Sequence, residues 1–125
     1  MPHILLAALG GAVGSSFRYL VGVWALRFFG PGYPWGTFIV NVVGSFLIGV
    51  LAEFIALKMN ASSELRVLIV TGFLGGFTTF SAFSLETMTL FERGALGLSA
   101  IYVLSSLVLS IAAVFAGLAL VRSLV

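Results

Sequence analysis

Hydrophobic residues fall into four long blocks along the chain, separated by short connections that are polar or rich in glycine and proline. The blocks cover residues 4–29, 35–57, 65–91 and 96–124. About 20 apolar residues in a helix cross the hydrocarbon core of a bilayer, and each block is at least that long. The pattern therefore predicts an all-α integral membrane protein, with residues 1–125 forming a single domain of four transmembrane helices.

The third block contains a stretch that is unusual for a membrane-spanning helix, TGFLGGFTTFSAFS from Thr71 to Ser84. Its glycines, Gly72, Gly75 and Gly76, each cost a helix interior about 1 kcal/mol relative to alanine. We therefore expect the third helix to be broken near its middle, close to Gly75 and Gly76. Irregular backbone at membrane depth is tolerated only where it is buried in protein or lines a cavity. Either the freed carbonyls bind a cation or the glycines form a packing seam, and the sequence leaves both open.

Composition supports a membrane protein and excludes several classes of function. The chain is 61% hydrophobic and 8% charged, with a mean hydropathy of +1.23, whereas about a quarter of the residues of a soluble domain are charged. A net charge of +2 is too small and too dispersed for a nucleic-acid surface. Without cysteine there are no disulfides and no thiolate metal sites. The sequence has no pattern of nucleophile and base, so we do not expect an enzyme.

The basic residues give only a weak preference for one membrane orientation. With an even number of spans, Lys58, Arg66 and Arg122 fall on the side of the N-terminus, and Arg27 and Arg93 fall on the other. Such a chain can insert both ways, which permits an antiparallel homodimer with inverted-topology halves. One short bundle also has little room for a water-lined path, so a pore would form between subunits. A single fixed orientation is the alternative.

Four polar side chains within the spans are candidates for a binding role. Asn41, in the second span, either presents its amide donors to an anion or joins two helices. Tyr102, Ser106 and Ser110 recur at i, i+4 and i+8, so they share one face of the fourth helix. Serines often bond back to their own helix, but three hydroxyls in register favour a polar track.

Phenylalanine and arginine supply the remaining candidates. Phe77, Phe80 and Phe83 follow the expected break at three-residue steps on one face of the continuing helix. They pack like other phenylalanines, or they turn their positive ring edges toward a small anion. Arg18 lies deep in the first block, where a charge is costly. It either snorkels toward the Gly30 end or concentrates anions in a watery vestibule.

Taken together, these motifs resemble the bacterial Fluc family of fluoride channels over essentially the whole chain. The features that carry the resemblance are the GFLGGFTTFSAFS run, Asn41, Arg18 and the row of Tyr102, Ser106 and Ser110. The resemblance implies a multi-pass protein of the bacterial inner membrane that assembles as a dual-topology antiparallel homodimer with two pores. Each pore would conduct fluoride passively, with strong preference over chloride, and so export it from the cytoplasm.

The resemblance also implies roles for individual residues. Asn41, Phe80, Phe83, Tyr102, Ser106 and Ser110 would form the fluoride pathway. The backbone carbonyls of Gly75 and Thr78, from both subunits, would hold a structural sodium ion that is not transported.

A proton-coupled exporter of small molecules is the competing hypothesis, because such transporters can share this size and layout. That mechanism needs a titratable carboxylate deep in the membrane. The chain has no aspartate, and Glu53 and Glu86 lie near the ends of their blocks. A subunit that only assembles with others would explain the glycines but not the aligned hydroxyls.

Overall fold

A computed structural model describes residues 2–57 and 63–124, and for residues 56, 57 and 63 it describes the backbone only. Lys58, which entered the orientation argument, lies outside the described residues. The chain is helical in every regular element of the described part. The elements are α1 (His3–Phe29), α2 (Trp35–Leu57), α3 (Ser63–Arg66), the π-helix η1 (Val67–Leu74), α4 (Gly75–Phe77), α5 (Ser81–Glu92) and α6 (Leu96–Leu124).

Four helical stretches of the described chain are long and apolar enough to span a membrane, which confirms the predicted spans. They are His3–Phe29, Trp35–Ile55, Glu64–Glu92 and Leu96–Leu124. Large apolar side chains remain exposed along them, for example Phe28 on α1 and Phe115 on α6. In water this surface would be unstable, but hydrocarbon solvates it.

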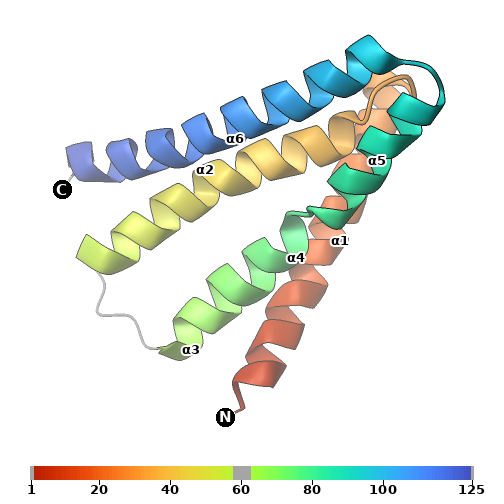
Figure 1. Ribbon diagram of the computed structural model, residues 1–125. Coiled ribbons are helices and arrows are strands. Elements are labelled where there is room, and N and C mark those ends of the chain that lie inside the picture. Colours follow the sequence, from red (N-terminus) through yellow and green to blue (C-terminus); the bar gives the residue numbers. More distant parts are fainter. Residues whose placement is uncertain (1, 58–62, 125) are drawn as a thin grey trace.

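The spans form two arms that diverge from one end of the molecule (Figure 1). One arm is α2 packed along α6, and the other is α1 packed along η1 and α4. At the shared end α5 contacts α6, while the N-terminus and the C-terminus lie at the tips of different arms. The third span therefore has α1 along one flank and faces α2 and α6 on the other.

Glycines allow the helices within each arm to approach closely. A Cβ on Gly14 would lie 2.8 Å from the amide nitrogen of Phe77, and one on Gly76 would lie 2.6 Å from the carbonyl oxygen of Gly11. In the other arm a Cβ on Gly117 would lie 2.8 Å from the amide nitrogen of Val50. These distances are too short for any side chain, so small residues determine the helix separation.

The third span is broken near its middle, as predicted, but the break comes a few residues later than the glycines indicate. Gly75 and Gly76 are helical, and the irregular backbone covers residues 78–80, where Thr78 is extended at φ −89° and ψ 162°. Gly76 instead packs closely against α1, in agreement with the alternative that the glycines form a packing seam. Adjacent β-branched threonines disfavour a helix, and their hydroxyls compete for its backbone groups. Phe77 therefore precedes the break, and the prediction that it shares a helix with Phe83 is wrong.

Candidate functional site

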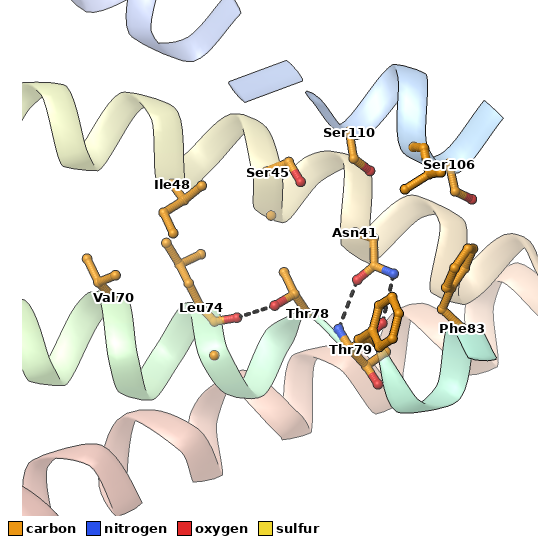
Figure 2. Close-up of a pocket in the computed structure, with 14 residues that line it drawn as sticks. Asn41, Ser45, Ile48, Val70, Leu74, Thr78, Thr79, Phe83, Ser106 and Ser110 are labelled. Atoms are coloured by element: carbon orange, nitrogen blue, oxygen red, sulfur yellow. Dashed lines mark hydrogen bonds between the residues drawn. The ribbon is translucent and has the colours of Figure 1, made fainter. Parts of the chain in front are cut away.

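A cavity of about 370 Å³ lies between the two arms, beside the break. Its walls come from α2, from the third span on both sides of the break, and from α6 (Figure 2). No charged side chain is among the residues that line it. The lining includes most of the residues singled out in the sequence: Asn41, Gly75, Thr78, Phe80, Phe83, Ser106 and Ser110.

Asn41 on α2 binds the break directly (Figure 2). Its Oδ1 accepts a hydrogen bond from the Thr79 amide at 2.8 Å, and its Nδ2 donates to the Thr79 carbonyl at 2.9 Å. The carboxamide thus replaces both backbone partners that Thr79 would have in a continuous helix. Because an amide nitrogen carries two hydrogens, one N–H of Asn41 is left after these bonds.

The break releases several carbonyl groups, and only some of them regain a donor. The Gly76 carbonyl accepts from Arg18, and the Thr79 carbonyl accepts from Asn41. The carbonyls of Gly75 and Thr78 gain no hydrogen-bond donor within the part of the chain that the structure describes. Both residues line the cavity. An unpaired carbonyl at membrane depth is costly, so these two require a ligand from elsewhere.

Phe80, the last residue of the break, and Phe83, in the first turn of α5, form an aromatic wall of the cavity. Their ring centroids are 5.8 Å apart, with the planes tilted by 42°. Phe80 is 76% exposed in the single chain, although it borders a partly polar cavity. A ring in this position can turn its positive edge toward an anion or cover a neighbouring surface.

The opposite wall carries hydroxyl groups from α6. Ser106 is buried, and its hydroxyl has no hydrogen-bond partner among the described residues. Ser110 follows one turn later and lines the same cavity. A buried hydroxyl without a partner costs about 1–3 kcal/mol, so a ligand or water in the cavity is the partner to expect.

Comparisons with known proteins find relatives that match nearly the whole chain. The model of a family described as "CrcB-like protein, Camphor Resistance (CrcB)" matches residues 5–118. The chain belongs to the CrcB-like family. Its relatives include a protein of Agrobacterium fabrum, 68% identical over 99% of both chains, and one of Caulobacter vibrioides, 56% identical over 98% of this chain and 97% of that one. Both are named "Fluoride-specific ion channel FluC".

In this CrcB-like protein, Tyr102 lies behind the cavity wall and not in it. Its side chain is fully buried, and its hydroxyl donates to Glu86 Oε1 at 3.2 Å. Its ring packs 5.0 Å from that of Phe83 and 5.4 Å from that of Tyr33. Tyr102 therefore supports the aromatic wall, while Ser106 and Ser110 of the same row reach the cavity.

Arg18 is half-buried at the middle of α1 and does not line the cavity either. Its Nε donates to the Gly76 carbonyl at 3.0 Å, and Ser15 Oγ approaches the same oxygen at 3.5 Å. The side chain thus binds the break, and the expected alternative that it snorkels toward Gly30 is wrong. This contact joins sites 58 residues apart, which no local sequence pattern indicates.

Thr79 is central to the site, although it was not among the residues predicted from the sequence. Besides its two backbone bonds to Asn41, its hydroxyl accepts from the Ala82 amide at 3.1 Å and so caps the first turn of α5. A threonine three residues before a helical amide is a recognised start signal. That signal indicates where the second half of the span begins.

We predict that Asn41→Ala loosens the break. Loss of one hydrogen bond to the Thr79 amide corresponds to about 1–1.5 kcal/mol, which is roughly a tenfold faster hydrogen exchange. The measurement is hydrogen–deuterium exchange at Thr79 in the membrane-reconstituted protein. Ser45→Ala is the matched control, because Ser45 lies one turn along α2 and lines the same cavity. Equal protection of Thr79 in wild type and Asn41→Ala would contradict the assignment.

Proposed function

We propose that this chain is the subunit of a fluoride-specific channel that lets cytoplasmic fluoride leave a bacterial cell through its plasma membrane. The supporting comparison is the high identity, over full length, to relatives named as fluoride-specific channels. The structural observation that carries the proposal is the cavity at the middle of the spans. It offers hydrogen-bond donors and aromatic rings, and no charged side chain lines it. As a passive channel, the protein would catalyse no chemical reaction, so it is not an enzyme.

Fluoride selectivity follows from what such a cavity can offer. Fluoride is small and strongly hydrated, so the protein must replace water with donors yet release the ion easily. The remaining N–H of Asn41, the hydroxyls of Ser106 and Ser110, and the ring edges of Phe80 and Phe83 supply partial positive charge. A full cation in the wall would bind the anion too tightly for rapid passage. Larger anions fit the short-range donors less well.

The complete channel is an antiparallel homodimer with two pathways. Gly75 and Phe80 are exposed in the single chain beside an open cavity. Hydrocarbon cannot cover this surface, because the Gly75 and Thr78 carbonyls have no donor among the described residues. A second copy of the chain, inserted the other way, brings the equivalent break to the same depth. The near balance of basic residues permits both orientations.

A sodium ion at the dimer centre, held by the Gly75 and Thr78 carbonyls of both subunits, would satisfy these groups. The residues fit it, because backbone carbonyl oxygens are ligands that alkali cations accept. The ion is structural in this proposal, and when bound it adds positive potential near the anion path. Conduction would then depend on the ion through the shape of the break and through this potential.

Proton-coupled export is disfavoured by the surroundings of the carboxylates. Glu53 pairs with Arg122 near the ends of α2 and α6, and Glu86 accepts a hydrogen bond from Tyr102. Neither lines the cavity. The mechanism would need a carboxylate on the pathway to exchange protons with substrate.

Liposomes that contain only the purified protein test the function. We expect a potassium ionophore to trigger rapid fluoride efflux from vesicles loaded with potassium fluoride, because the ionophore removes the opposing charge. Chloride-loaded vesicles should release little. A fluoride electrode and a chloride electrode measure the two rates. Equal rates, or efflux that requires counter-movement of protons, would refute the channel.

The aromatic wall is tested by Phe80→Ile and Phe83→Ile. Each removes a ring edge worth about 1 kcal/mol or more to an anion, so we expect fluoride efflux to fall by roughly tenfold. Phe91→Ile is the matched control, because Phe91 is exposed on α5 away from the cavity. Size-exclusion chromatography checks that the oligomer is intact. Normal efflux in both variants would assign the rings to packing alone.

Sodium dependence is tested by purification in a large organic cation at constant ionic strength. We expect efflux to be lost and then restored when sodium is added back, since the unpaired carbonyls would have no other ligand. The readout is fluoride efflux against sodium concentration. Full activity without sodium would remove the ion from the proposal.

A further inference from the structure

We propose that Arg18 is a positioning residue that holds the Gly76 carbonyl through one directed N–H, and not a charge that attracts anions. The contact comes from Nε, at 3.0 Å from the carbonyl oxygen. In an unbroken helix this carbonyl would accept from the amide of residue 80, four positions later. The break removes that partner, and Arg18 replaces it with a charge-assisted hydrogen bond.

The face of α1 that meets Gly76 is built for this contact. Gly11, Ser15 and Arg18 stand at i, i+4 and i+7, so they share one stripe of the helix. A Cβ on Gly76 would lie 2.6 Å from the Gly11 carbonyl oxygen, which sets the separation of α1 and α4. Ser15 Oγ lies 3.5 Å from the Gly76 carbonyl oxygen. The glycines fix the distance, and Arg18 then fixes the direction of the carbonyl.

This arrangement divides the carbonyls of the break into two groups. Arg18 holds the Gly76 carbonyl on the α1 side, and Asn41 holds the Thr79 carbonyl on the α2 side. The Gly75 and Thr78 carbonyls, which lack donors in the described chain, stay available for a ligand. Without Arg18 the Gly76 carbonyl has only the long Ser15 contact, so the backbone around it is free to reorient. The consequence for sodium binding rests on the proposed function, whereas the clamp itself does not.

Two substitutions separate the directed N–H from the charge. In Arg18→Gln, the side-chain Nε2 occupies the same place along the chain of bonds as arginine Nε, so the donor stays and the charge is lost. In Arg18→Lys, a methylene occupies that place, so the charge stays and the donor moves one bond outward. Arg18→Met removes both. Arg27→Gln on the same helix is the control for loss of a positive charge, because Arg27 is exposed.

The primary readout reports the clamp without any ion flux. Labelling glycine with carbonyl ¹³C and phenylalanine with ¹⁵N marks only two peptide bonds, Gly72–Phe73 and Gly76–Phe77. Solid-state NMR then gives two signals, and the Gly72 signal is the internal control. We expect the Gly76 signal to move in Arg18→Lys and Arg18→Met, and to stay near the wild-type position in Arg18→Gln and Arg27→Gln.

The second readout is the sodium concentration that half-restores fluoride efflux. We expect it to rise by about tenfold in Arg18→Lys relative to Arg18→Gln, as for loss of one charge-assisted hydrogen bond. If the Gly76 signal is retained in the lysine variant and lost in the glutamine variant, or moves in neither, the clamp is refuted. If Arg18→Met does not fold, the glutamine and lysine variants alone decide.

The experiments can refute the clamp and the proposed channel independently of each other. An unmoved Gly76 signal in Arg18→Lys overturns the clamp even when the wild type conducts fluoride. A Gly76 signal that follows the donor upholds the clamp even when the wild type conducts no fluoride, and that result would overturn only the proposed channel.

Discussion

Backbone N–H and C=O groups in the hydrocarbon core cannot form hydrogen bonds with water. The architecture around residues 78–80 follows from that constraint. A helix satisfies these groups internally, so any interruption creates a demand for partners that the rest of the protein must meet. Here part of this demand is met from both flanks. Asn41 reaches in from α2 and Arg18 from α1, each to a different carbonyl. These hydrogen bonds offset part of the cost of interrupting the helix, and they also fix the position of the residues beside the cavity.

Close helix packing is what makes those partners available. A side chain can reach a neighbouring backbone only if the two helices nearly touch, and the glycine contacts of each arm allow that approach. Gly44 illustrates the same point from α2, since a Cβ there would overlap the Thr78 side chain. The glycines of the third span therefore matter less as helix breakers than as spacers. They bring α1 near enough for Arg18 to act on Gly76.

The sequence alone was a good guide to what depends on local composition. Hydropathy set the four spans to within a few residues, because length and apolarity decide what can cross a bilayer. It misplaced the break, since glycine propensity was outweighed by packing against α1 and by the two threonines that follow. It also grouped Phe77 with Phe83 and Tyr102 with the cavity, because a regular period assumes a continuous helix and an even environment. The Arg18 contact depends on tertiary structure, so no periodicity could have indicated it.

The pair of hydrogen bonds between Asn41 and Thr79 also limits how many donors the cavity has to offer. An amide that serves the backbone on one side has a single N–H left for anything on the other. Together with the hydroxyls of Ser106 and Ser110, this N–H leaves each subunit with few hydrogen-bond donors at the cavity. In the proposed channel, an anion beside Asn41 would have few hydrogen bonds to the protein, which favours its release. In the proposed channel, the residue that stabilises the cavity wall would thus also keep the binding of the anion weak.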